Sequence, residues 1–242
     1  MALFDRFQSQ YKYVYEYIKS GKPGQPKAVF ANRLSQPYWS SNDMIVNLMI
    51  HDIDYLYWML GKPNSVISLG TQTPAGANEH INILLEYENT SVMLEGSTVM
   101  PKSFPFSTCI RIVCENEAIE LKWYWGPNGP VNDLTLYPND GEPEKIVIPD
   151  YDPYQAECRY MIDCINRKAD PKLLGIETAY NINLYLKNTT LSETSAEIQY
   201  TFEIPPSRLT PDKRGLTALN RLLVFHRLSS VLAHYVSSSS PA

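Results

Sequence analysis

Seven short runs of apolar and β-branched residues between positions 65 and 148 constrain the fold more than any other feature. They fall at residues 65–69, 81–87, 91–95, 109–114, 118–122, 134–137 and 145–148. Such short, partly alternating runs are typical of strands. Glu88-Asn89 and Glu115-Asn116-Glu117 stand where hairpin turns would fall. Because strands this close together are most simply antiparallel neighbours, the pattern predicts a mainly antiparallel sheet.

Helical spacing appears on both sides of these runs. The expected helices are residues 8–21, 42–60, 153–167 and 176–195, and residues 27–34 form an additional strand between the first two helices. Ser41 or Asn42 can cap the second helix and Gly61 ends it, while Pro153 suits a first helical turn. The alternating strand–helix rhythm of a nucleotide-binding sheet is missing. The order predicts an α+β fold, an open sheet with helices packed on one face.

The charge pattern changes near residue 203. From residue 204 onward there is one acid, Asp212, against five Lys or Arg, whereas acids are in excess before it. We therefore expect a domain over residues 1–203 and an atypical basic tail over residues 204–242. The tail is interpreted as a poorly ordered or non-native extension in preference to a membrane-surface helix.

Composition excludes several classes of function. A net charge of −5 gives no support for nucleic-acid binding, which usually needs a clustered basic face. No apolar run is long enough to span a membrane, and the N-terminus lacks the apolar core of a signal peptide, so the expected location is the cytoplasm. The four cysteines form no C-x-x-C pair, so no metal site is expected.

The most informative stretch is residues 41–61, SNDMIVNLMIHDIDYLYWMLG. Each helical residue advances the direction by about 100°, so Asp43, Asn47, His51 and Asp54 share an arc of about 80°. Trp58 lies on the same side. A polar stripe on so apolar a helix is costly to bury without partners, so it predicts the lining of a solvated pocket. Asp52 faces away from the stripe and is interpreted as a surface or interface charge.

Alcohol–ketone interconversion is the chemistry that such a stripe can support. It needs a base for the hydroxyl proton, and histidine suits that role near neutral pH. Asn47 could hold a second hydroxyl or orient the imidazole of His51. Asp54 could fix the histidine tautomer or cap backbone groups. The alternative is that His51 is a hydrogen-bonded packing residue with no catalytic role.

The same residues resemble the signature of the glucose–fructose oxidoreductase and inositol dehydrogenase family, Gfo/Idh/MocA. The resemblance rests on His51-Asp52-Ile53-Asp54 with Trp58-Met59-Leu60-Gly61-Lys62-Pro63, on Phe4-Asp5-Arg6-Phe7, on Ile18-Lys19-Ser20-Gly21-Lys22-Pro23-Gly24, and on residues 154–165 and 177–194. It spans about residues 3 to 200. It implies the C-terminal, substrate-binding and oligomerisation domain of these enzymes, with no Rossmann domain in this chain.

The resemblance also implies a reaction, the reversible NAD- or NADP-dependent oxidation of a hydroxyl on a sugar, nucleotide sugar or inositol. His51 then takes the position of the catalytic base, and Asn47 that of a family aspartate, which an amide replaces here. Arg33, Trp39, Asn47 and Asp54 are the candidate substrate contacts, although plain surface roles are favoured for Arg33 and Trp39. A homo-oligomer through the sheet face is expected.

No cofactor-binding residue is predicted, because no G-x-G-x-x-G follows a strand. The leading expectation is therefore a truncated or divergent dehydrogenase domain that is inactive without a separate cofactor domain. The alternatives are a non-catalytic module that binds carbohydrate or dimerises, and a structural subunit that pairs with a full-length paralogue.

Overall fold

A single eight-stranded sheet dominates the computed structural model, which describes residues 4–37, 48–72 and 78–174. Its spatial order is β2-β3-β4-β1-β5-β6-β7-β8. Within that order β1 pairs with β4 in parallel, and every other neighbouring pair of these strands is antiparallel. The strands are β1 (Pro26–Leu34), β2 (Ser65–Gln72), β3 (Asn78–Glu86), β4 (Ser91–Ser97), β5 (Ser107–Cys114), β6 (Glu117–Gly126), β7 (Gly129–Pro138) and β8 (Glu144–Lys145).

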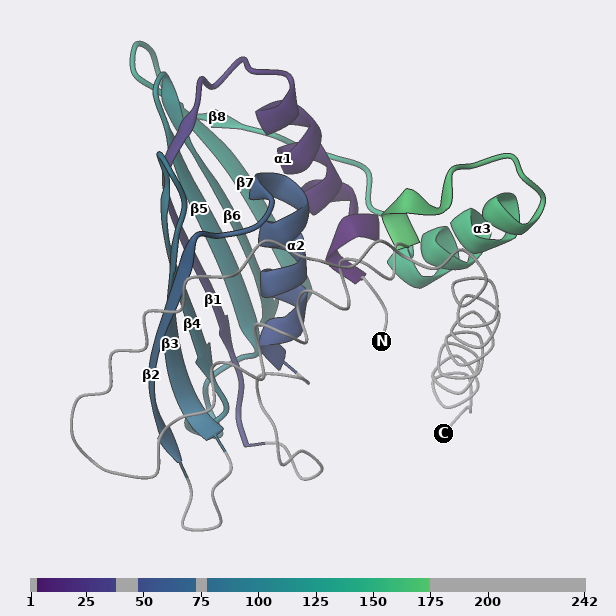
Figure 1. Cartoon of the computed structure of the whole chain (residues 1–242). Coiled ribbons are helices and arrows are strands. Elements are labelled where there is room, and N and C mark those ends of the chain that lie inside the picture. The colour runs from purple at the N-terminus through teal and green to yellow at the C-terminus, as the bar shows by residue number, and fades with distance from the viewer. Residues whose placement is uncertain (1–3, 38–47, 73–77, 175–242) are drawn as a thin grey trace, which may run out of the picture.

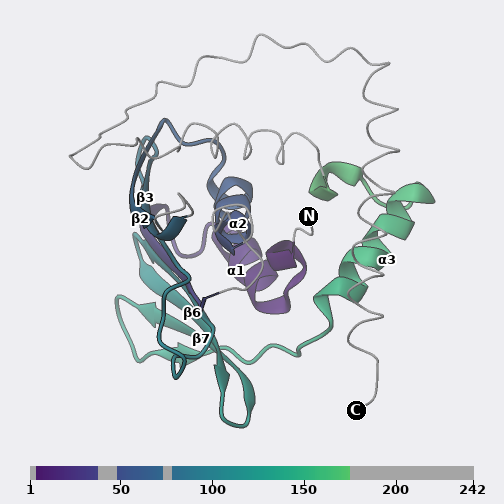
Figure 2. The same cartoon turned by 90° about the horizontal axis from the view of Figure 1, so that it is seen from below.

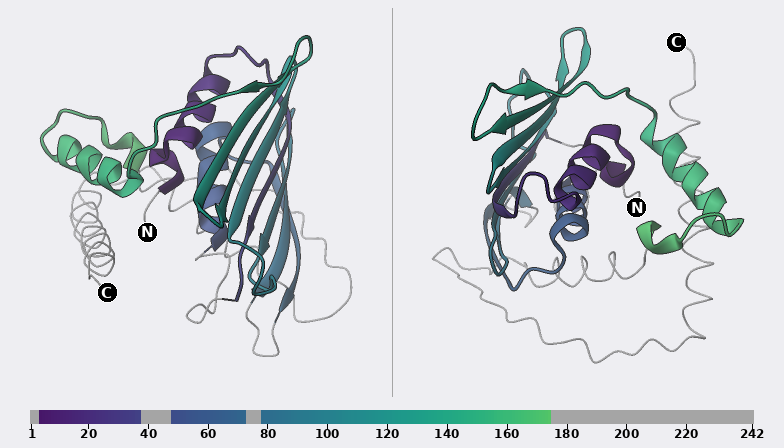
Figure 3. Two further views of the ribbon diagram at one scale, coloured as in Figure 1. Left: turned by 180° about the vertical axis from the view of Figure 1, so that it is seen from behind. Right: turned by 90° about the horizontal axis from the view of Figure 1, so that it is seen from above.

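Two helices, α1 (Ser9–Lys19) and α2 (Ile50–Leu60), lie side by side on one face of this sheet (Figures 1 and 2). The 3-10 turn η1 (Phe4–Phe7) leads into α1. Helix α3 (Pro153–Ile165) and the turn η3 (Pro171–Leu174) lie farther from the sheet, beyond η1. No described helix covers the opposite face (Figure 3). This arrangement confirms the predicted open, mainly antiparallel sheet with helices on one face.

The helix boundaries follow from local sequence. Gly61, with φ of +83°, ends α2 in a backbone conformation that favours glycine. At the start of α3 the Asp152 carboxylate accepts hydrogen bonds from the backbone N–H groups of Tyr154 and Gln155, and Pro153 occupies the first turn. The predicted role of Pro153 is thus confirmed.

The core lies between the helices and the inner face of the sheet. Alternate residues of the central strands point inward, and the buried set includes Ile81, Ile83, Val92, Leu94, Val29, Ala31, Ile110, Ile112, Ile119 and Leu121. From the helices, Val14 and Leu56 are fully buried against them. Burial of each such large side chain stabilises the fold by about 1.5–3 kcal/mol.

Several predicted bounds change. Strands β6 and β7 extend well past the predicted residues 118–122 and 134–137, while β8 covers only part of the predicted run 145–148. The predicted helix start at residues 42–47, the helix 176–195 and the tail 204–242 lie outside the described residues. In the part of the chain that the structure describes, no helix is long and apolar enough to cross a membrane.

Alternating cations and aromatic rings join η1, α1 and α2. The Arg6 guanidinium lies 5.5 Å from the centre of the Trp58 ring, and Trp58 stacks on Tyr15 with centroids 3.5 Å apart. The Lys19 ammonium lies 5.7 Å from the other ring of that pair, Tyr15. Such contacts each contribute about 0.5–2 kcal/mol, and they fix how α1 sits against α2.

Buried ion pairs attach η1 to both α2 and β1. Arg6 donates two hydrogen bonds to the carboxylate of Asp54, each 2.7 Å long. Arg33 of β1 donates to Asp52 at 2.7 and 3.1 Å and to Asp5 at 2.7 Å. All five side chains are almost completely buried. We call Asp5, Arg6, Arg33, Asp52 and Asp54 the ion cluster; it holds three carboxylates against two guanidinium groups.

Removing one cation from the ion cluster is expected to destabilise the fold strongly. Arg33→Met leaves two buried carboxylates without their partner, so we expect the free energy of unfolding to fall by about 3–5 kcal/mol. The matched control is Arg111→Met on the neighbouring strand β5, whose half-exposed guanidinium pairs with Glu120 at 3.1 Å and should cost less than about 1 kcal/mol. Urea denaturation measures both. Equal losses would contradict the structural role of the ion cluster.

Candidate functional site

His51 lies in the first turn of α2, at the end of the helix that faces η1. Its ring is half-buried. Phe4 approaches it edge-on, with ring centroids 6.4 Å apart, and Phe4 in turn contacts Tyr154 of α3 at 4.9 Å. No residue among those that the structure describes forms a hydrogen bond with the imidazole. The ring is therefore neither enclosed on all sides nor held by a described polar partner.

The surroundings of His51 keep the ring neutral. Its pKa is lowered to about 4, first because burial disfavours the charged form and then because the positive charge of Arg33 is near; the carboxylate of Asp52 opposes the shift. A neutral imidazole at pH 7 has one unprotonated nitrogen, so it can accept a proton from a hydroxyl group.

The residue after His51 corrects one sequence-based interpretation. Asp52 is 6% exposed and pairs with Arg33, so its interpretation as a surface or interface charge is wrong. The helix wheel was right that Asp52 points away from the polar stripe. However, that side of α2 faces the sheet, where Arg33 points inward from β1. Burial raises the pKa of Asp52 and of Asp5, and Arg33 counteracts the shift in both.

The other predicted site residues have different surroundings. Asp54 is 2% exposed and accepts both hydrogen bonds from Arg6. Arg33 is 6% exposed, which excludes the alternative of a surface residue. The structure thus brings Arg33 next to α2, whereas Asn47 and Trp39 lie outside the described residues.

Asp5 and Arg6 were missed as site residues. They were recognised only as part of a segment that resembles the family, yet they provide the partners of Arg33 and Asp54. An Asp-Arg pair between two phenylalanines, in a segment rich in aromatic residues, was the available signal. The signal is weak because nothing local shows that the pair is buried.

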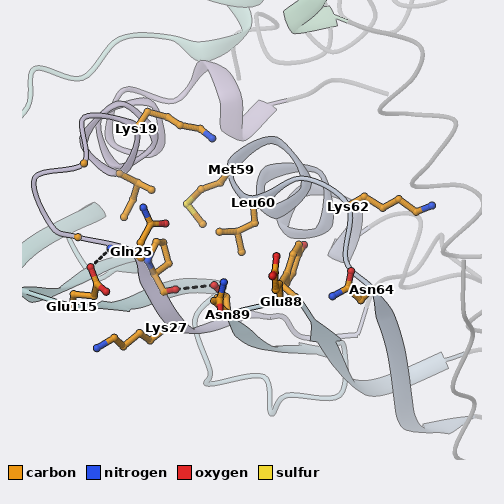
Figure 4. A pocket seen from close by; sticks show the side chains of 16 residues that line it. Lys19, Gln25, Lys27, Met59, Leu60, Lys62, Asn64, Glu88, Asn89 and Glu115 are labelled. Carbon is orange, nitrogen blue, oxygen red and sulfur yellow. Dashed lines mark hydrogen bonds between the residues drawn. The ribbon is translucent and has the colours of Figure 1, made fainter. Parts of the chain in front are cut away.

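A cavity of about 1030 Å³ lies at the opposite end of α2 from His51. Met59 and Leu60 point toward the β3–β4 turn that carries Glu88 and Asn89 (Figure 4). The lining includes Lys19, Lys27 and Lys62 together with Glu88 and Glu115, and it contains no histidine. Residues at the C-terminal ends of α1 and α2 also line it. The candidate proton acceptor therefore does not belong to this cavity.

Metal ligation has no basis in the described residues. Within ranges 4–37, 48–72 and 78–174, no group of three or more His, Cys, Asp or Glu side chains is placed to hold a metal ion. The carboxylates near His51 form ion pairs with guanidinium groups instead.

Solved structures resemble this chain in fold. UDP-N-acetylglucosamine 3-dehydrogenase GnnA from Acidithiobacillus ferrooxidans matches with a TM-score of 0.61 and 20% identity, over 76% of this chain and 58% of that one. A protein of Desulfitobacterium hafniense named as an NADPH-dependent oxidoreductase matches with a TM-score of 0.64 and 14% identity, over 76% and 60%. An oxidoreductase from Bacillus cereus matches with a TM-score of 0.63 and 13% identity, over 85% and 65%.

These matches extend over only part of each relative. The chain spans about three fifths of the length of the first two structures. No curated protein matches the chain.

Protonation of His51 should reduce stability as the pH falls. The pKa in the folded protein, about 4, lies below the ordinary value of 6.5, so the unfolded chain takes up the proton first. The contribution of a neutral His51 is thus complete above pH 6.5 and is lost progressively from pH 6.5 down to about 4. Because Asp5 and Asp52 titrate as well, the quantity to measure is the difference in unfolding free energy between the wild type and His51→Gln. A difference that stays constant with pH would contradict the shift.

The sequence of residues 11–120 matches the GFO/IDH/MocA C-terminal domain. The open sheet with α1 and α2 on one face is the fold of that domain in the solved oxidoreductases. Both findings agree with the resemblance carried by His51 to Asp54. Residues 11–120 therefore match the C-terminal domain of the Gfo/Idh/MocA oxidoreductases, and the chain has the fold of that domain.

Proposed function

We propose that this chain is the substrate-binding part of a sugar or polyol oxidoreductase, in which His51 takes the proton of the hydroxyl group that is oxidised. One observation carries the proposal: a neutral, half-buried imidazole with no described hydrogen-bond partner, next to a rigid buried ion cluster. A packing histidine would normally use its ring nitrogens in hydrogen bonds.

The ion cluster gives His51 a fixed position. Asp52 and Asp54 follow it in the first turn of α2, and both are held by guanidinium groups from other segments. Arg33 and Asp54 act on the substrate through His51 in this proposal, as positioning residues. Asn47 and Trp39 remain the proposed direct contacts for the other hydroxyl groups.

The described residues do not fit a dinucleotide. A helix N-terminus that binds a pyrophosphate usually follows a glycine-rich turn, yet Gln8, Met49 and Asp152 stand at the N-terminal caps of α1, α2 and α3. The carboxylate of Asp152 would also repel a phosphate. We therefore propose that NAD or NADP is held elsewhere, by a dinucleotide-binding domain, and that these residues alone are inactive.

The substrate class follows from the family and from one relative. The name of that relative, UDP-N-acetylglucosamine 3-dehydrogenase, makes a nucleotide sugar the first candidate, followed by free hexoses and inositols. With four thiols that form no disulfide, the proposed location is the reducing cytoplasm.

Replacing His51 tests the proposal. In the chain supplied with a separately produced dinucleotide-binding domain of the family, we expect His51→Gln to lower turnover by roughly 10² to 10⁴ while the substrate still binds. Reduction of NAD or NADP is followed by absorbance at substrate saturation. His80→Gln, near the start of β3, is the matched control and should leave turnover unchanged. Equal turnover in the His51 variant and the wild type would refute the assigned role.

The outer face of the sheet favours a second role, pairing with another copy of the chain. Leu69, Leu84, Met93 and Val113 are between 40% and 68% exposed there, and a shallow cavity of about 300 Å³ opens between Phe30 and Met93. Exposed apolar side chains this close together are typical of protein interfaces. This pairing would exist whether or not the chain is part of an enzyme.

A charge on that face should prevent the pairing. We expect wild-type protein to be a dimer at micromolar concentration and Leu84→Glu to be a monomer, because a buried carboxylate at the centre of an interface is costly. Val147→Glu is the control, since Val147 is 92% exposed and lies outside the sheet. Size-exclusion chromatography with light scattering decides; a monomeric wild type would overturn the proposed pairing.

A further inference from the structure

Three aromatic side chains are grouped on the inner face of the sheet, at the end away from the cavity shown in Figure 4. Phe106 meets Trp123 edge-on with centroids 5.7 Å apart, and Trp123 meets Trp125 at 6.0 Å. Trp125 is 59% exposed. We call Phe106, Trp123 and Trp125 the aromatic platform. Exposed apolar rings grouped on the helix side of the sheet are typical of a surface that binds a ligand or another protein.

The register of the sheet fixes which way these rings face. Alternate residues of a strand point to opposite faces of the sheet. Trp123 and Trp125 therefore point to the same face as Ile119 and Leu121, which are buried beneath the helices, and Tyr124 points to the other face. Phe106 packs against the same core. The aromatic platform therefore lies on the face that carries α1 and α2, whereas Tyr124 points to the outer face.

The same register places the aromatic platform at the His51 end of the molecule. Arg33 of β1 pairs with Thr108 of β5, and Thr108 pairs with Trp123 of β6. Two strand spacings of about 4.8 Å separate the backbones of Arg33 and Trp123 by about 10 Å. Because Arg33 is bonded to Asp52, the residue next to His51, the rings lie within the reach of one extended ligand.

The start of α2 gives the same position for the aromatic platform relative to His51. Gly96 of β4 pairs with Arg33 on the other side of β1. A Cβ added to Gly96 would lie only 2.5 Å from the Met49 side chain, so the residue just before α2 touches the same row. Helix α2 thus begins over the paired residues Gly96, Arg33, Thr108 and Trp123, which lie side by side across β4, β1, β5 and β6.

A polar group accompanies the rings. Asn132 of β7 pairs with Trp123, and its side chain points to the same face of the sheet as the buried Leu134. Its amide therefore lies on the inner face, next to the aromatic platform. Flat apolar rings beside an amide suit a carbohydrate. The C–H face of a sugar ring can cover the indole, while the amide donates to and accepts from the hydroxyl groups.

We propose that the aromatic platform, with Asn132, is the surface that holds a ring of the carbohydrate substrate and so determines specificity. The inference rests on the proposed function, because it takes the sugar bound near His51 as the occupant. Trp125 supplies the stacking surface, Trp123 and Phe106 fix its tilt, and the substrate extends from there toward His51.

Calorimetric titration of the whole chain with myo-inositol, N-acetylglucosamine and UDP-N-acetylglucosamine tests this. For whichever probe binds, we expect Trp125→Ala to raise Kd about tenfold and Trp125→Phe to raise it less, since loss of a stacked ring typically weakens binding by this order. Tyr124→Ala, on the same strand but on the outer face, should leave Kd unchanged. Melting temperatures verify that each variant is folded.

A measurement on the wild type covers the case in which Trp125→Ala fails to fold. The indole N–H resonance of Trp125 should shift in an NMR titration with the probe that binds, and that of Trp58, stacked on Tyr15, should shift less. An unchanged Trp125 resonance, or the same Kd in Trp125→Phe, Trp125→Ala and the wild type, would overturn the inference.

The outcomes separate this inference from the proposed function. If Kd responds to Trp125→Ala and the His51→Gln variant loses turnover, both stand. If only Trp125→Ala has an effect, the aromatic platform stands and the role of His51 fails. If only His51→Gln has an effect, the aromatic platform is bare surface or a contact with another domain, and the inference fails alone. If no probe binds, the inference is overturned, and the turnover of His51→Gln decides the proposed function separately.

Discussion

The ion pair between Arg33 and Asp52 is the contact on which the candidate site depends. It joins the central strand β1 to the first turn of α2, and Asp5 extends it to η1. Burying charges is costly, so these groups are favourable only while their geometry is complete. That requirement makes the segment around His51 rigid. Burial lowers the pKa of His51, and the nearby guanidinium of Arg33 lowers it further, whereas Asp52 opposes the shift.

Helical and strand periodicity made most of the fold predictable. Tyr11, Val14 and Ile18 repeat at helical spacing, and all three are buried in α1. Turn residues at Glu88-Asn89 and Glu115-Asn116 separate antiparallel strands, as expected. Both strands of the β6–β7 hairpin were predicted, but the parts next to their turn were missed, although Asn128-Gly129 at the tip is a common turn signal. Near its end, β6 contains Trp123-Tyr124-Trp125, which places aromatic residues on both faces and so hides the alternation.

The candidate site was less predictable than the fold, because it is built from contacts between distant segments. The helix wheel gave the direction of His51, Asp54 and Trp58 correctly relative to one another, but it could not show what each would meet. Asp54 meets Arg6 from 48 residues away, and Asp52 meets Arg33 from 19 residues away. A local pattern contains no information on such pairs, and an aspartate that looks exposed on a helix wheel was in fact buried against the sheet.

Direct observation of the His51 ring gives the sharpest test of the account. In the wild-type chain labelled with ¹⁵N-histidine, NMR can follow the two ring nitrogens between pH 3 and 8, with and without a saturating sugar or polyol. We predict a ring that stays neutral down to about pH 5 and whose resonances shift when the ligand binds. A ring that titrates near pH 6.5 and does not respond to any ligand would contradict the account, because His51 would then be an ordinary surface histidine.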